Sequence, residues 1–180
     1  MQRGELEHAI RAATEIIRQE SVFVIGSQSI LGSFTENELP AEATFSEEVD
    51  IAPINDDDAQ SLATELDAAI GEMSYFHETH GFYVQGVGRS TAVLPAGWTE
   101  RLVILSNENT LGRTGLCLEP HDLCVAKLIA GRTKDHLFVG ALLRHGIVRP
   151  EIIAERLLTV SEDEVRRDRA ISWIRSTLQP

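Results

Sequence analysis

Apolar residues recur at helical spacing in the first and last thirds of the chain. In residues 4–19, the positions of Leu6, Ile10, Ala13 and Ile17 fall on one face of a helix. Helical spacing and helix-start signals predict further helices at residues 55–73, 119–132, 134–145, 150–159 and 162–178. The chain is therefore rich in amphipathic helices.

Three of these helices have recognisable start signals. Asn55 or Asp56 is expected to cap the helix in residues 55–73. Pro120 suits a first helical position, because its missing N–H would have no partner there. Ser161 and Glu164 have the spacing of a capping box.

Short apolar runs bounded by turn residues predict strands in the middle of the chain. Residues 21–26 form a β-branched run that ends in glycine, and residues 48–54 form the next run. A short helix over residues 27–34 and a polar loop over residues 35–45 are expected between them. Several antiparallel strands are expected beyond, at about residues 81–87, 91–94, 101–106 and 115–118.

This order of elements predicts an α+β fold with a mixed sheet of about five strands flanked by helices. We divide the chain into an α/β core, residues 1–118, and a C-terminal helical region, residues 119–180. The helical region is expected to pack on the core as part of one compact unit.

The charge of the chain limits the ligands that it can take. The 180 residues carry 28 acidic and 16 basic side chains, a formal charge of −12. This charge argues against broad electrostatic wrapping of DNA or RNA. It leaves room for a small anionic ligand whose charge a divalent cation neutralises.

The hydropathy pattern predicts a soluble, cytoplasmic protein without membrane contact. No apolar run approaches the ~18 residues of a membrane span, and the charged N-terminal segment has no apolar leader. Cys117 and Cys124 lie seven residues apart, which is not a metal-binding spacing. We expect them to be small buried thiols in a reducing compartment.

The turn Gly26-Ser27 follows the first predicted strand directly. A glycine here allows a ligand to approach the backbone, and a helix N-terminus offers free N–H groups that suit phosphate. The Ser27 hydroxyl adds a donor. The alternative is an ordinary strand–helix turn in which Ser27 is only a cap.

Two carboxylates begin the next strand. Glu48 and Asp50 are two residues apart, so they point to the same face of a strand and repel each other. A hard divalent cation such as Mg²⁺ would reconcile them. The alternative is an edge strand with a solvated acidic face.

A basic cluster lies near the end of the helix that Pro120 starts. Lys127 shares a helix face with Leu123 and Ala130, so it points inward and needs Glu48, Asp50 or a phosphate as a partner. Arg132 and Lys134 follow closely, and this local positive patch would suit a triphosphate. The alternative is a set of snorkelling side chains on an exposed helix.

These motifs together resemble the nucleotidyltransferase superfamily, which has the DNA polymerase β-like fold. In that family a Gly-Ser turn holds the phosphates of a nucleoside triphosphate, and two carboxylates of the next strand bind Mg²⁺. The segment LEPHDLCVAKLIAGRTKDHLFVGALL (residues 118–143) resembles AbiEii-like proteins and small bacterial relatives of uncharacterised function, as does PAGWTERLV (residues 95–103). The resemblance covers nearly the whole chain.

The resemblance implies a role for each motif residue. The residues implied in catalysis are Glu48, Asp50 and Lys127, and the first two also bind the metal. The residues implied in nucleotide binding are Gly26, Ser27, Arg132, Lys134 and Asp135. Asp135 orients Lys127 or Arg132, or caps the helix in residues 134–145.

The chain departs from the family pattern in two ways. Glu48 stands where aspartate is commoner, and the later strand offers Gln85 where a third carboxylate often completes the site. Two functions follow. One is transfer of a nucleoside monophosphate from a triphosphate to a hydroxyl of an RNA, a protein or a small molecule, in a toxin–antitoxin context. The other is a non-catalytic nucleotide-binding or antitoxin-like module.

Several residues could contact a binding partner of the chain. Trp98 and Arg101 could contact a base or an acceptor, or Trp98 could pack at a sheet edge. The first helix and the last one, with Ile171 and Ile174, could form a homodimer face or pack on the sheet. A cognate toxin or antitoxin is a further partner that the family resemblance implies.

Overall fold

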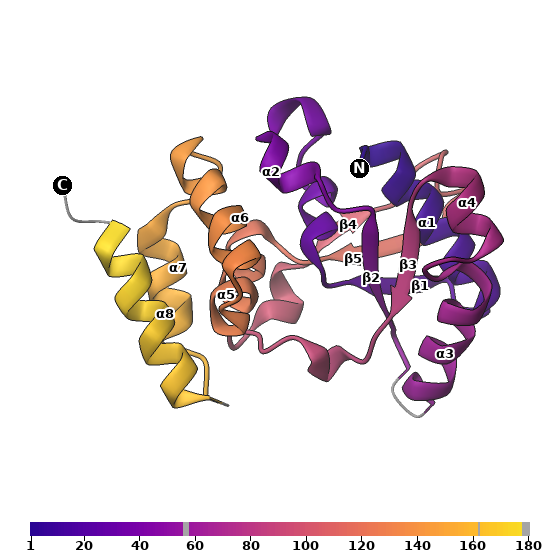
Figure 1. Cartoon of the computed structure of the whole chain (residues 1–180). Helices are drawn as coiled ribbons and strands as arrows, with labels where there is room; N and C mark the ends of the chain where they lie inside the picture. Colours follow the sequence, from indigo (N-terminus) through magenta and orange to yellow (C-terminus); the bar gives the residue numbers. More distant parts are fainter. Residues whose placement is uncertain (56–57, 162, 178–180) are drawn as a thin grey trace.

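The chain folds into a five-stranded mixed sheet with helices on both sides (Figure 1). The structure is a computed structural model that describes residues 1–55, 58–161 and 163–177. The strands are β1 (Ser21–Val24), β2 (Glu48–Pro53), β3 (Tyr83–Gly86), β4 (Val103–Leu105) and β5 (Thr114–Cys117), in the spatial order β3-β2-β1-β5-β4. The predicted α+β class and the predicted mixed sheet are confirmed.

The direction of two strands differs from the prediction. β1 pairs with β2 and β4 with β5 in antiparallel fashion, but β2–β3 and β1–β5 are parallel pairs. Strand β3 is parallel to β2 because the helical segment between them returns the chain to the same end of the sheet before β3 starts.

Residues 91–94, which were predicted as a strand, do not pair with the sheet. The 3₁₀ turn η3 (Arg89–Thr91) is followed by residues 92–94 in non-strand conformation. Ala92, Val93 and Leu94 pack against the hydrophobic core. The apolar pattern there reflects packing of an extended segment, without strand pairing.

The long predicted helices are all present. They are α1 (Arg3–Ile16), α3 (Ala59–Ile70), α5 (Pro120–Ala130), α6 (Thr133–Arg144), α7 (Pro150–Leu157) and α8 (Glu164–Thr177). Pro120 occupies the first turn of α5, as predicted. In α1 the stripe Leu6, Ala9, Ile10 and Ala13 is buried, which explains why this segment forms a helix against the sheet.

Two predicted caps are wrong. Helix α3 begins at Ala59 with Asp58 at the N-cap, so Asn55 is not its cap, and Asp56 lies outside the described residues. Helix α8 begins at Glu164, and the Asp163 carboxylate accepts the N–H of Arg166 at 3.0 Å. Asp163 therefore caps α8 in place of the predicted Ser161–Glu164 box.

Some short helices were not predicted because they are too short to show a period. The region predicted as a loop contains η2 (Glu36–Glu38) and α2 (Ala41–Thr44). Helix α4 (Tyr75–His80) also precedes β3, and its N-terminus is capped by the Ser74 side chain, which accepts the N–H of His77. Local capping defines η2 and α4, whereas α2 has no side-chain cap.

The helices lie in two groups (Figure 1). Helices α1, α3 and α4 stand beside the sheet, and α5 to α8 pack on one another on the other side. The 3₁₀ helix η1 (Ser27–Gly32) contacts α1, α5, β2 and β5, and so joins the groups. One hydrophobic cluster runs from α1 through the sheet to Ile153 of α7 and Ile174 of α8.

The apolar faces of the first and last helices are buried within the chain. Ile171 and Ile174 are buried in α8, which packs on α5 and α7 and not on the sheet. Among the helices that the structure describes, none is both long and apolar enough to cross a membrane.

The close contact between α3 and β3 generates a stability prediction. A Cβ added at Gly86 would lie 2.6 Å from the Cα of Ala63, a backbone atom that cannot move aside alone. Gly86→Ala should therefore lower the free energy of unfolding by about 2 kcal/mol or more, measured by denaturant titration. Gly88→Ala is the matched control, since its Cβ would meet only the Ser90 Oγ, at 3.8 Å. Equal stability of the two variants would contradict the prediction.

Candidate functional site

The Gly26-Ser27 turn lies between β1 and η1. The N–H of Ile25 donates to the carbonyl of Asp50 at 3.1 Å, which continues the β1–β2 pairing up to the turn. Gly26 is the N-cap of η1, a 3₁₀ helix that is shorter than the predicted residues 27–34. The sheet thus holds the turn directly beside the acid-bearing strand.

Position 26 must be glycine because the Asp50 side chain lies against its backbone. A Cβ at Gly26 would overlap the carboxylate of Asp50. The sequence indicated a close approach to this backbone, and the group that makes the approach is Asp50. The turn and the acidic strand therefore form one unit.

Glu48 and Asp50 lie on the same face of β2, and Val49 and Ile51 are buried on the opposite face. Burial, and next the negative charge of Glu48, raise the pKa of Asp50 from its usual 3.8 to about 6. The nearby cations Lys127, Arg132 and Lys134 oppose this shift only in part. The acid pair is therefore under electrostatic strain.

The neighbouring strand places Gln85 beside this pair. In the parallel β2–β3 ladder Asp50 is in register with Gln85, and Glu48 with Tyr83. No group of three or more His, Cys, Asp and Glu side chains that could hold a metal occurs in the described parts of the chain. Two carboxylates and the Gln85 carbonyl oxygen still form an all-oxygen donor set, which fits Mg²⁺, an ion that commonly binds one or two carboxylates together with substrate phosphates.

The basic side chains come from the junction of α5 and α6. Gly131 ends α5 in the left-handed conformation (φ 66°), which reverses the chain within one residue. Lys127 is 9% exposed, and its Nζ lies 3.5 Å from Asp135 Oδ1. Its ion-pair partner is thus Asp135, one of the roles predicted for that residue, and neither Glu48 nor Asp50.

Asp135 holds two of the cations in place. It is 1% exposed, and its Oδ2 accepts the Nε–H of Arg132 at 2.7 Å and the N–H of Arg132 at 3.2 Å. Burial alone would raise the pKa of Asp135, but the Arg132 hydrogen bond and the charge of Lys127 outweigh it, and the pKa is lowered. Asp135 therefore stays ionised, orients Lys127 and Arg132, and caps α6.

One cavity of about 430 Å³ brings the predicted residues together between the sheet and α5. Its lining includes Gly26, Ser27, Glu48, Asp50, Lys127, Arg132 and Lys134. Asp135 does not line the cavity and lies behind its basic wall. Acidic and basic walls thus enclose a single space.

Sequence reasoning missed part of the lining. The residues that it did not single out are Ile25, Ser46, Val87, Thr91, Ala92, Val93, Ala126, Ile129 and Arg166. Arg166 comes from α8, more than 100 residues after the acid pair, so no local pattern connected the two. The apolar run at residues 91–94 predicts a strand, but residues 91–93 instead line the cavity.

Comparison with known proteins places the chain in a family. A family model described as "Nucleotidyltransferase of unknown function (DUF6036)" matches residues 4–173. The chain belongs to this family. Searches of curated proteins and of solved structures found no significant match. The match confirms the resemblance to an uncharacterised nucleotidyltransferase family, and the narrower AbiEii-like resemblance stays a prediction.

The strain at Asp50 predicts a stability change that depends on pH. Because the pKa of Asp50 is raised on folding, the folded chain binds the proton more tightly than the unfolded chain does, and stability falls as pH rises from about 4 to 7. In Mg²⁺-free buffer, Asp50→Asn should be more stable than wild type by about 3 kcal/mol at pH 7.5 and nearly equal at pH 4. Chemical unfolding at several pH values measures this difference.

The control for this experiment is Glu65→Gln, which neutralises an exposed carboxylate on α3. It should show no comparable gain at any pH. A gain of Asp50→Asn that is the same at pH 4 and pH 7.5 would contradict the electrostatic explanation.

Proposed function

We propose that the chain is a Mg²⁺-dependent nucleotidyltransferase that transfers a nucleoside monophosphate from a triphosphate to an acceptor hydroxyl. The observation that carries the proposal is the single cavity in which Glu48 and Asp50 share the space with Lys127, Arg132 and Lys134. A metal-bound triphosphate needs both kinds of charge around it. The family match supports the transfer of a nucleotidyl group in general terms.

The basic wall would bind the phosphates. Arg132 is held by Asp135, so its guanidinium is already oriented before a ligand arrives. Lys127 would neutralise charge that develops on the leaving pyrophosphate. Gly26 and Ser27 would contact the phosphates from the end of the cavity formed by β1 and η1.

Glu48 and Asp50 would hold Mg²⁺. The ion, when bound, supplies positive charge to the phosphate oxygens during in-line displacement. The acceptor oxygen attacks the α-phosphorus, the bond between the α-phosphorus and the bridging oxygen breaks, pyrophosphate leaves, and the hydroxyl proton passes to water. The electrostatic strain between the two carboxylates favours cation binding, because a cation lowers the cost of ionising Asp50.

The acceptor is an RNA, a protein or a small molecule. The formal charge of −12 disfavours a long nucleic-acid footprint, so an RNA acceptor would enter by its end. The AbiEii-like resemblance implies a toxin–antitoxin context for this transfer, with a cognate toxin or antitoxin as partner.

One observation favours a non-catalytic binding module instead. Gln85 lies beside Asp50, at the position where a carboxylate would complete the metal site. A site with two acids and an amide would bind a nucleotide with fewer anionic ligands for a second metal ion. This alternative predicts binding without turnover.

Calorimetric titration tests nucleotide binding. ATP, GTP, CTP and UTP, each with and without Mg²⁺, are titrated into wild type, Asp50→Asn and the control Glu65→Gln. We expect Mg²⁺-dependent binding in wild type and in the control, and loss of that binding in Asp50→Asn, because one of the two carboxylate ligands of the metal is gone. Equal affinity of Asp50→Asn and wild type would refute the proposed site.

A turnover assay separates the two functions. The nucleotide that binds, labelled at the α-phosphate, is incubated with total RNA and with protein extract, and pyrophosphate release and label transfer are measured. Release that requires Asp50 supports the transferase. Binding without release in any mixture supports the non-catalytic module.

A further inference from the structure

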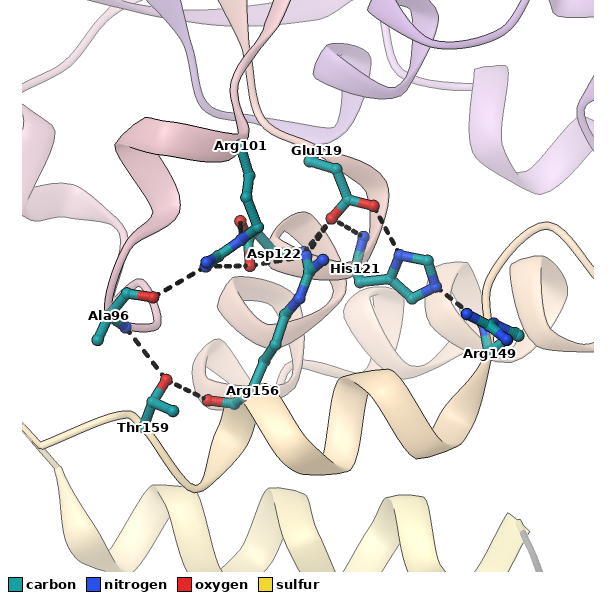
Figure 2. A network of polar contacts seen from close by, with 8 residues as sticks. All are labelled: Ala96, Arg101, Glu119, His121, Asp122, Arg149, Arg156 and Thr159. Atoms are coloured by element: carbon teal, nitrogen blue, oxygen red, sulfur yellow. Dashed lines mark hydrogen bonds and ion pairs between the residues drawn. The ribbon is translucent and has the colours of Figure 1, made fainter.

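A buried carboxylate receives two guanidinium groups at the N-terminal end of α5 (Figure 2). Asp122 is 0% exposed. It accepts hydrogen bonds from Arg101 Nε at 2.8 Å, Arg101 Nη2 at 3.0 Å and Arg156 Nη1 at 2.9 Å. A buried charge with paired, planar donors fixes the orientation of the elements that carry them.

Arg101 connects this carboxylate to the loop before it. Its Nη2 also donates to the carbonyl of Ala96 at 2.9 Å. The N–H of Ala96 donates to Thr159 Oγ1 at 3.1 Å, and that hydroxyl donates to the carbonyl of Arg156 at 2.7 Å. The loop is therefore tied to α5 through Asp122 and to the end of α7 through Thr159, as Figure 2 shows.

Glu119 extends the same network to the start of α7. It accepts hydrogen bonds from His121 Nδ1 at 2.7 Å and from Arg156 Nη1. The backbone N–H of Arg149, the N-cap of α7, donates to His121 Nε2 at 3.1 Å, so His121 contacts Glu119 with one ring nitrogen and α7 with the other. Both ends of α7 are thus joined to the first turn of α5.

The network adjoins the cavity on two sides. Asp122, Ala126 and Ile129 follow one another at helical i, i+4 and i+7 spacing, and the last two line the cavity. The loop at Ala96 and Arg101 continues the chain from residues 91–93, which also line the cavity. The chain that leaves residues 91–93 is therefore tied to α5 where Arg101 meets Asp122.

Arg101 and Trp98 do not themselves reach the ligand space. Trp98 packs against Phe23 of β1 with ring centroids 5.5 Å apart, and neither residue belongs to the lining of the cavity. Their contacts fix the segment that follows the wall. The sequence allowed a direct contact of Arg101 with a base or an acceptor, but Arg101 lies outside the cavity lining.

We propose that Asp122 is a positioning residue that, through Arg101 and Arg156, sets the spacing between the 91–93 wall and α5, and so the affinity of the cavity for a nucleotide. This inference rests on the proposed nucleotide-binding function. Charge alone is insufficient for the role, because two parallel hydrogen bonds are needed to fix the angle of Arg101. Arg101→Lys, which keeps the charge and loses the fork, should therefore be a poor substitute.

The test compares Arg101→Lys, Arg101→Gln and Asp122→Asn with wild type. We expect each variant to bind the preferred Mg²⁺-nucleotide about tenfold more weakly, within the range that remote positioning changes produce. Hydrogen–deuterium exchange of the backbone amides in residues 88–96 should become faster in the same variants, and exchange in β1 and β2 should not change.

The control for lost stability is Ile153→Val, which removes one buried methylene group from α7 away from the cavity. All titrations are made well below the unfolding temperature of each variant. A merely structural role would lower stability in the control and in the variants alike and would leave nucleotide affinity unchanged.

The outcomes separate this inference from the proposed function. If wild type binds no nucleotide, the proposed function fails and this inference fails with it. If wild type binds and Arg101→Lys binds equally well, only the positioning role is refuted. Should Asp122→Asn not fold, the two Arg101 variants still decide the question.

Discussion

The arrangement of the cavity depends on one electrostatic constraint, which is that β2 carries two carboxylates on one face. One of them, Asp50, is pressed against the backbone of Gly26, where no larger residue would fit. Burial and the repulsion from Glu48 make the ionised form of Asp50 unfavourable, as its raised pKa indicates. A single substitution such as Asp50→Asn would remove this repulsion. Strain of this kind is typical of functional sites, where a ligand can relieve it.

The compensating positive charge comes from distant parts of the sequence. Lys127 and Arg132 follow the acid pair by about 80 residues and line the same cavity. They would repel one another without Asp135, which is buried and forms an ion pair with each of them. The site thus has the acid pair on one wall, the two cations on another, and Asp135 behind the cations. Asp135 orients the two cations, and their positive charge still acts on the cavity.

The sequence predicted the elements well where local patterns decide them. The period of α1, the proline of α5 and the strand before Gly26 all appear as expected. The errors lie where tertiary contacts decide. The direction of β3 depends on a crossover, and residues 92–94 pack against the core without pairing as a strand. Motif spacing brought the acid pair and Lys127 to attention, but it could not indicate Arg166 or Asp122, whose relation to the cavity arises only in three dimensions.

Helix α5 carries a buried ion-pair residue at each of its ends. In its first turn, Asp122 is clamped by Arg101 and Arg156, and in its last turn Lys127 is held by Asp135. A helix of 11 residues that is fixed at both ends by buried ion pairs can neither rotate nor slide without breaking one of them. Buried ion pairs contribute little net stability compared with apolar packing, so their presence at both ends is better explained by orientation than by stability. The face of α5 that lines the cavity is therefore fixed by charge at both ends, and the acid pair on β2 meets a basic wall whose position is already set.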